Sequence, residues 1–137
     1  MKQLKLYGVL LLMLIIACKT MSFNVGKSTK QIHYPGIKSG TSFIKYKVVF
    51  KSEDIFVIER ILLNDENINN YELYNVHLRR YVKTNSSHNN GDYILTFKKK
   101  DIRRIDTKDM LSLVLKGKFR TEKINVDVRK IKPSRKR

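Results

Sequence analysis

The sequence predicts an all-β fold, a single antiparallel β-sandwich of about six to seven strands. Apolar and polar residues alternate with a period of two in several short segments. Clusters of Asn, Asp, Ser and Gly separate these segments, and no long segment has the 3.6-residue period of a helix. Short strands at close spacing, with turn clusters between them, are typical of sandwiches and small barrels.

The strongest strand signal lies in residues 43–50. Every second residue from Ile44 to Phe50 is apolar, whereas Lys45 and Lys47 share the opposite face. The next segment, residues 55–63, is almost continuously aliphatic. It predicts a central strand, with a helix as the alternative, and the polar residues 64–67 end it.

Further strands are predicted at residues 71–82, 93–97, 111–115 and 124–128. In the first of these, the alternation puts Val76 and Leu78 inside and Asn75, His77 and Arg79 outside. Residues 85–91 predict a polar loop, residues 101–108 a short helical turn, and Gly117 a turn between the last two strands. By analogy, this pattern favours an immunoglobulin-like sandwich, although the chain has no Trp and only one Cys.

The first 17 residues have the pattern of a secretory signal peptide. Lys2 and Lys5 precede twelve uncharged residues, 6–17, which end in the small residue Ala17 directly before Cys18. A helix that spans a bilayer needs about 20 apolar residues, so this segment is too short for a permanent span. We therefore expect residues 1–17 to be removed.

The four residues Ile15-Ile16-Ala17-Cys18 resemble the lipobox of bacterial lipoproteins. The resemblance implies cleavage before Cys18, attachment of a diacylglycerol to its sulfur, and acylation, for example by palmitate, of the new amino group. It implies an anchor in the outer membrane, on the periplasmic face, because Lys19 follows the cysteine and no acidic run comes after it. The mature part is similar only in general terms to small β-sandwich lipoproteins of bacterial envelopes, a likeness that implies no functional residues.

The chain thus divides into four predicted parts. Residues 1–17 form the signal peptide, 18–40 the lipidated cysteine and a flexible tether, 41–129 the β-sandwich domain, and 130–137 a basic tail. Cys18 is the only cysteine, which excludes an internal disulfide and a thiolate metal cluster.

Positive charge is the strongest compositional feature. The chain carries 29 Lys and Arg against 12 Asp and Glu, a formal net charge of +17. Such an excess attracts anionic surfaces. The residues predicted to form an anion-binding surface are Lys45, Lys47, Arg79, Lys98, Lys99, Lys100, Arg103 and Arg104. The alternative is a solvated surface that protects sheet edges from aggregation.

No catalytic or metal-binding residues are predicted, and no cofactor is expected. His33, His77 and His88 lack metal-ligand spacing and are expected at the surface. Asp106 is expected to cap a short turn, or either Asp106 or Asp109 to offset the basic residues Arg103, Arg104 and Lys108.

The resulting functional hypothesis is a non-enzymatic, membrane-anchored envelope module. Its expected partners are an anionic lipid, lipopolysaccharide or peptidoglycan, or an outer-membrane protein complex. Two alternatives are an accessory subunit that binds an acidic protein and a small envelope hydrolase. The export signal argues against nucleic acid as a partner, although the charge would suit it.

Overall fold

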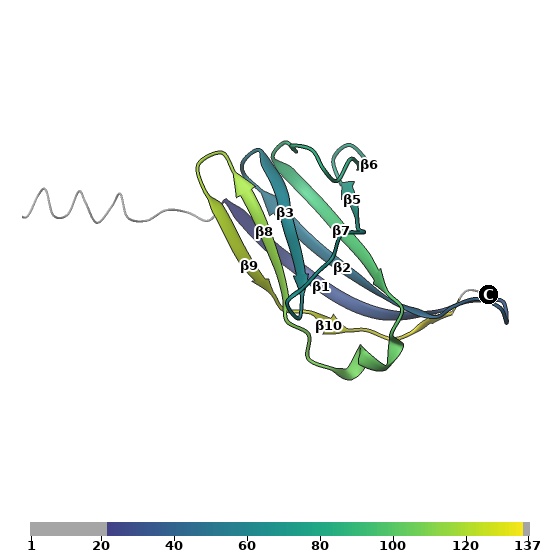
Figure 1. Ribbon diagram of the computed structural model, residues 1–137. Coiled ribbons are helices and arrows are strands. Elements are labelled where there is room, and N and C mark those ends of the chain that lie inside the picture. The colour runs from purple at the N-terminus through teal and green to yellow at the C-terminus, as the bar shows by residue number, and fades with distance from the viewer. Residues whose placement is uncertain (1–21, 136–137) are drawn as a thin grey trace, which may run out of the picture.

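The computed structural model describes residues 22–135, which form two β-sheets and one short 3₁₀ helix (Figure 1). The all-β prediction is confirmed, because no α-helix occurs among these residues. The predicted signal peptide and the predicted lipidation site Cys18 lie outside the described residues.

Eleven strands make up the two sheets. They are β1 (Phe23–Tyr34), β2 (Phe43–Ser52), β3 (Phe56–Leu63), β4 (Glu66–Asn67), β5 (Glu72–Asn75), β6 (Arg80–Val82), β7 (Gly91–Lys99), β8 (Leu111–Gly117), β9 (Thr121–Val126), β10 (Arg129–Lys130) and β11 (Ser134–Arg135). The 3₁₀ helix η1 (Ile102–Asp106) joins β7 to β8. Sheet A has the order β10-β1-β2-β7-β5-β6, with β11 also paired to β1, and sheet B has the order β4-β3-β8-β9.

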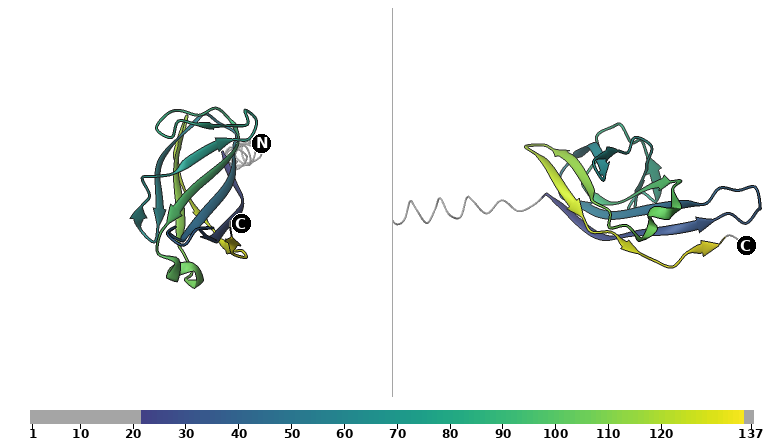
Figure 2. Two further views of the ribbon diagram at one scale, coloured as in Figure 1. Left: turned by 90° about the vertical axis from the view of Figure 1, so that its right-hand side faces the viewer. Right: turned by 60° about the horizontal axis from the view of Figure 1, so that its bottom comes forward.

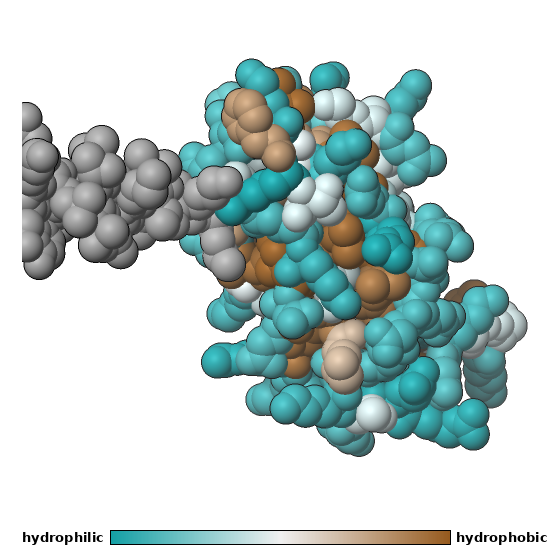
Figure 3. Space-filling model, turned by 60° about the vertical axis from the view of Figure 1, so that its left-hand side comes forward, coloured by the Kyte–Doolittle hydropathy of each residue, from teal (hydrophilic) through white to brown (hydrophobic). Residues whose placement is uncertain are grey.

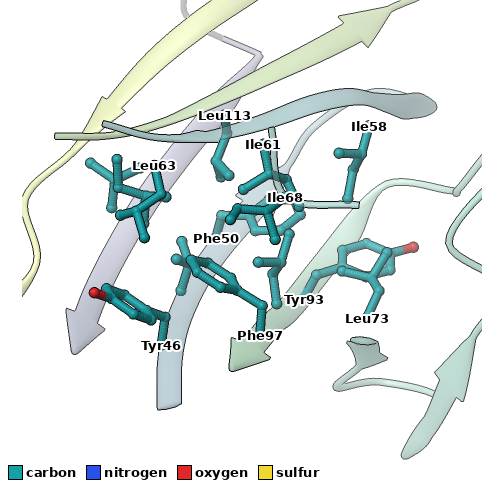
Figure 4. Packing of buried hydrophobic residues seen from close by; sticks show 14 of the residues in the cluster. Tyr46, Phe50, Ile58, Ile61, Leu63, Ile68, Leu73, Tyr93, Phe97 and Leu113 are labelled. Atoms are coloured by element: carbon teal, nitrogen blue, oxygen red, sulfur yellow. The ribbon is translucent and has the colours of Figure 1, made fainter. Parts of the chain in front are cut away.

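One hydrophobic core lies between the two sheets (Figure 4). Alternate residues of β2 and β7, such as Tyr46, Phe50 and Tyr93, face sheet B, and all three are at most 1% exposed. Sheet B contributes residues such as Ile61 and Leu113. Burial of each such side chain contributes about 1.5–3 kcal/mol, so this core is the main source of stability.

Most of the predicted strands are confirmed. Residues 43–50 lie in β2, 93–97 in β7, 111–115 in β8 and 124–126 in β9. Residues 56–63 form strand β3 and not a helix, and a register shift between Ile58 and Arg60 leaves both Glu59 and Arg60 exposed. The predicted helical turn at residues 101–108 is η1, and Gly117 precedes the predicted turn, where its N–H donates to the carbonyl of Arg120.

The single strand predicted at residues 71–82 is wrong. Strands β5 and β6 form a hairpin around a turn at residues 76–79, so Val76 and Leu78 are 41% and 50% exposed. Asn75, predicted to face outward, is buried, and its side chain has two hydrogen-bond partners. Its oxygen accepts from the N–H of Leu78, a bond that closes the turn, and its amide group donates to the hydroxyl of Tyr93. Arg79 has a φ of 52°, as tight turns often require.

The predicted tether is also wrong over residues 23–34, which form β1. This strand pairs with β2 in antiparallel register from Phe23 to His33, with one irregularity between Val25 and Ser28. The inward positions Ser28, Lys30 and Ile32 are buried. Because two of these three are polar, the segment lacks the apolar alternation that marks the other strands.

The C-terminal residues belong to the domain as well, so the predicted domain limits, 41–129, are too narrow. Strands β10 and β11 run parallel to β1, and residues 129–135 follow β1 towards the β1–β2 hairpin (Figure 2). Sheet A is therefore mixed and not purely antiparallel. These strands cover part of an edge of β1 that would otherwise expose unpaired backbone groups.

The domain has two ends, a proximal end and a distal end. At the proximal end, Ser22 and Phe23 lie with the turns at residues 53–55, 76–79 and 117–120 (Figure 1). At the distal end lie the β1–β2 loop at residues 35–42, the turn at 64–65, and η1. The long strands run from one end to the other, and the pairing registers show which residues of each strand belong to the proximal half and which to the distal half.

Candidate anion-binding surface

Positive charge is concentrated in the distal half of the domain. By strand register, this half comprises residues 29–47, 60–72, 96–114 and 123–135. It holds 16 Lys and Arg against 7 Asp and Glu, whereas the proximal part of residues 22–135 holds 8 against 5. The distal half therefore carries most of the excess that can attract an anion.

Three lysines share the outer face of sheet A. Lys45 lies opposite Lys98 in the pairing of β2 with β7, and Lys47 lies opposite Thr96. Their strand neighbours Tyr46 and Phe97 are buried against sheet B, so the alternation turns the three lysines to the outside. Within residues 22–135, none of the three forms an ion pair with a carboxylate.

Aromatic rings lie among these cations. The Phe43 ring stacks on His33, with 5.3 Å between ring centroids, and Lys98 Nζ lies 5.0 Å from the Phe43 centroid. At the end of β1, the Arg135 guanidinium lies 5.7 Å from the Tyr34 ring. Such cation–ring contacts hold the long basic side chains over the face of the sheet.

A pocket of about 290 Å³ lies beside η1, where charges of both signs meet. Lys99 Nζ is 2.8 Å from Glu66, and this hydrogen bond holds the pKa of Glu66 below its usual range. Asp101 caps η1 by accepting from the N–H and Nε of Arg103, and the bond to the Arg103 side chain lowers the pKa of Asp101. Arg104 lines the pocket without a carboxylate partner among the described residues.

The floor of this pocket is a buried polar network. Asp109 accepts from Lys30 Nζ at 2.9 Å, from Tyr46 Oη at 2.6 Å and from Asn64 Nδ2 at 3.1 Å. Burial raises the pKa of Asp109, but these three hydrogen bonds outweigh burial and leave the pKa below its ordinary value. Burial and the bond to Asp109 raise the pKa of Tyr46. Because Lys30, Tyr46 and Asn64 all donate hydrogen bonds to Asp109, we assign this network a structural role and not a ligand-binding one.

The C-terminal segment adds four further cations to this half. Thr29 lies opposite Arg129 and Lys30 opposite Lys130, and the Gln31 side chain donates to the carbonyl of Lys132 at 2.6 Å. Arg135 lies opposite Tyr34. Pairing with β1 thus brings the predicted basic tail onto the same half as Lys45 and Lys98.

The structure brings together seven of the eight predicted anion-binding residues. Lys45, Lys47, Lys98, Lys99, Lys100, Arg103 and Arg104 lie in the distal half, whereas Arg79 lies in the β5–β6 turn at the proximal end. Lys99 and Arg103 are each neutralised by a carboxylate. The predicted cations without a carboxylate partner among the described residues are therefore Lys45, Lys47, Lys98, Lys100 and Arg104. These five residues and the C-terminal cations Arg129, Lys132 and Arg135 make up what we call the distal basic surface.

Sequence reasoning missed Lys30, and with it the role of Asp109. Neither carboxylate of the predicted pair caps η1: Asp101 does so, Asp109 binds Lys30, and Asp106 binds Lys130. Ser28, Lys30 and Ile32 are every second residue of β1 and all are buried. This period of two could have predicted that Lys30 faces inward.

The prediction that all three histidines are solvated is wrong for His88. Its N–H and carbonyl both bond to Phe56, and the residue is 5% exposed, with its ring beside those of Phe56 and Tyr93. Burial lowers the pKa of His88, and a backbone hydrogen bond with Thr84 opposes this shift in part. His77 is exposed in the β5–β6 turn, and within residues 22–135 no group of three His, Cys, Asp or Glu side chains has the arrangement of a metal site.

The chain matches no protein-family model, and comparisons with curated proteins and with solved structures give no match. None of the helices in the described part of the chain has the length and apolar character to cross a membrane.

Proposed function

We propose that this protein is a lipid-anchored module of a bacterial envelope whose distal basic surface binds an anionic envelope component without catalysing a reaction. The lipobox residues Ile15-Ile16-Ala17-Cys18 support the anchor. Lys19 after the cysteine favours the outer membrane, and the lack of an acidic run after it favours the periplasmic face. The observation that carries the binding proposal is the group of cations without carboxylate partners in the distal half, among them Lys45, Lys47 and Lys98.

The described chain enters the domain at the proximal end, whereas the distal basic surface lies at the other end, and this separation favours one kind of partner. Lys45 is seven residues along β2 from Ser52 at the proximal end, or roughly 23 Å at about 3.3 Å per residue. The Debye length is about 8 Å at physiological ionic strength, so the surface potential of the anchoring membrane is screened at that distance. We therefore favour peptidoglycan, with its stem-peptide carboxylates, over the lipids of the same membrane.

An immunoglobulin-like sandwich is the architecture that we propose for this module. The order β1-β2-β7-β5 in sheet A corresponds to the A-B-E-D sheet of immunoglobulin domains. The order β4-β3-β8-β9 in sheet B corresponds to C′-C-F-G. On this assignment, β10 and β11 are additions that follow the last immunoglobulin strand and return to the first.

Binding to isolated peptidoglycan tests the function. The full lipoprotein, purified in detergent micelles, is sedimented with insoluble sacculi at increasing salt. A triple variant, Lys45→Gln with Lys47→Gln and Lys98→Gln, is expected to bind at least on the order of 10-fold more weakly, since each cation near an anionic surface contributes about 1 kcal/mol before screening. The matched control changes the exposed proximal residues Lys27, Lys83 and Lys116 to Gln and is expected to bind nearly as well.

Equal losses in the two triple variants would show that net charge alone matters and would contradict a defined surface. No salt-sensitive sedimentation of the unmodified protein would exclude peptidoglycan. Co-purification of one acidic protein after mild detergent extraction would instead favour the accessory-subunit alternative.

The anchor is tested separately by the mass and the membrane partition of the mature protein. We expect an N-terminal acylated Cys18, and a Cys18→Ser variant that is neither lipidated nor cleaved by the lipoprotein peptidase. A wild-type protein that begins at Met1 and stays soluble would overturn the envelope location.

A further inference from the structure

Four exposed apolar side chains lie on the turns of the proximal end. Phe119 is 86% exposed, Ile55 54%, Leu78 50% and Val76 41%. They belong to the β8–β9, β2–β3 and β5–β6 turns, and we call these four side chains the proximal tip. Exposed apolar residues also occur in the distal half, at Ile37, Met110 and Ile131, but the four proximal ones lie on three turns at the end where the described chain begins. Apolar residues gathered on adjacent turns in this way suit a contact surface.

The described chain begins beside this tip. Phe23 packs edge-on against Phe56, with 5.8 Å between ring centroids, and a Cβ on Gly117 would lie 3.7 Å from Phe23 Cζ. The carbonyl of Ser22 accepts from the N–H of Glu53 at 2.8 Å. The start of β1 therefore contacts the segments that carry Ile55 and Phe119. Figure 3 shows apolar surface beside the point where the grey trace meets the domain.

The length of chain before β1 limits how far the tip can lie from Cys18. Phe23 is the fifth residue after Cys18, and a fully extended chain spans at most about 3.6 Å per residue, or roughly 18 Å in all. Phe119 is two residues from Gly117, which lies beside the Phe23 ring. An acylated Cys18 thus keeps the start of β1, and with it the end of the domain that carries the proximal tip, within reach of the lipid surface.

The charges around the tip suit a lipid headgroup region. Lys118 Nζ lies 5.4 Å from the Phe119 ring centroid, and Lys116 and Arg79 are exposed nearby. Of the acidic residues at this end, Glu53 pairs with Lys51 and Glu122 with Arg120. An aromatic ring beside a lysine is a common arrangement at membrane interfaces, because the ring enters the acyl boundary while the ammonium group stays with the phosphates.

We propose that the proximal tip inserts into the interface of the membrane that holds the Cys18 lipid, with Phe119 as its deepest residue. The proposal rests on the acylation of Cys18 in the proposed function. Contact through three turns, in addition to one flexible attachment, fixes the orientation of the domain and turns the distal basic surface away from the bilayer.

The absence of Trp from the chain allows a direct test. A Phe119→Trp variant of the full lipoprotein is reconstituted into vesicles of phosphatidylethanolamine and phosphatidylglycerol, with or without bromine near the headgroup end of the acyl chains. Bromine quenches only nearby indoles. We expect emission about twofold lower in brominated vesicles, as for an indole at the interface. The matched control is Ile37→Trp in the β1–β2 loop of the distal end, where Ile37 is 69% exposed, and we expect no quenching there.

The mass of the purified protein separates failure of the anchor from failure of the orientation. An acylated Cys18 with equal emission of Phe119→Trp in the two kinds of vesicle would reject insertion of the tip and leave the anchor intact. Quenching of Ile37→Trp instead would show the opposite orientation. An unmodified Cys18 would reject the proposed anchor, and insertion would then be supported only if added brominated vesicles still quenched Phe119→Trp.

Discussion

Lys30 and Asp109, 79 residues apart in the chain, form an ion pair of 2.9 Å in which the two side chains are only 5% and 1% exposed. The pair connects the first strand of sheet A to the segment that enters β8 of sheet B. Lys30 also donates to the carbonyl of Thr107 at 2.5 Å, and Asp109 accepts from Tyr46 and Asn64. Each charge therefore has the partners that burial requires.

Removing one member of this pair should strongly destabilise the domain. In Lys30→Ala, Asp109 keeps its charge but loses its cation, and an uncompensated buried charge costs about 3–5 kcal/mol. Urea unfolding of the full chain, followed by circular dichroism, measures the change. The control is Lys130→Ala, which breaks the exposed pair with Asp106 and should cost less than about 1 kcal/mol. Similar losses in the two variants would show that the buried pair has no special role.

The same pair should make the fold sensitive to strong acid. The pKa of Asp109 in the folded state lies below its ordinary value of 3.8, so its contribution is present above that pH. The contribution is lost as the pH falls further, towards the folded-state pKa. Asp109→Asn should be less stable than wild type at pH 7, and the difference between them should shrink between pH 4 and pH 2. A constant difference over this range would contradict the assignment.

His88 should cause a separate loss of stability in milder acid. Burial beside Phe56 and Tyr93 holds the pKa of His88 below 6.5, so the unfolded chain takes up a proton at a higher pH than the folded chain. The free energy of unfolding should therefore fall as the pH drops below about 6.5, by at most about 1.4 kcal/mol per pH unit from this residue.

Two neutral replacements distinguish this effect from that of other histidines. His88→Gln should flatten the pH dependence of unfolding between pH 7.5 and pH 5.5. His77→Gln, which changes an exposed histidine in the β5–β6 turn, is the matched control. The slope is obtained from urea titrations at several pH values, and the same slope in His88→Gln as in wild type would reject the prediction.

The C-terminal strands should protect the edge of β1 as well as supply charge. Deleting residues 129–137 exposes the backbone groups of β1 that pair with β10 and β11, and an open edge promotes pairing between chains. We expect the truncated protein to form larger particles in light scattering. A full-length variant with Arg129, Lys132 and Arg135 changed to Gln keeps the strands and should stay monodisperse while binding peptidoglycan more weakly. Aggregation of both variants would show that charge, not strand pairing, protects the edge.

Strand prediction succeeded where one face of a strand meets the core and the other meets water. Residues 43–50 alternate because Tyr46 and Phe50 are buried while Lys47 is exposed. It failed at β1, where a buried lysine replaces an apolar residue. It failed again at residues 76–79, where apolar residues continue the alternation through a turn that a side-chain hydrogen bond of Asn75 closes.

The sequence by itself determined the β class, the main strands, the excess of positive charge and the expectation of a lipidated Cys18, because each of these depends on local order along the chain. Only the tertiary structure decided which cations lie next to one another. Lys45 and Lys98 are 53 residues apart and become neighbours through the register of β2 with β7. Likewise, Asp109 becomes the partner of Lys30 only after the two sheets pack, since neither burial nor charge pairing across such distances leaves a local pattern.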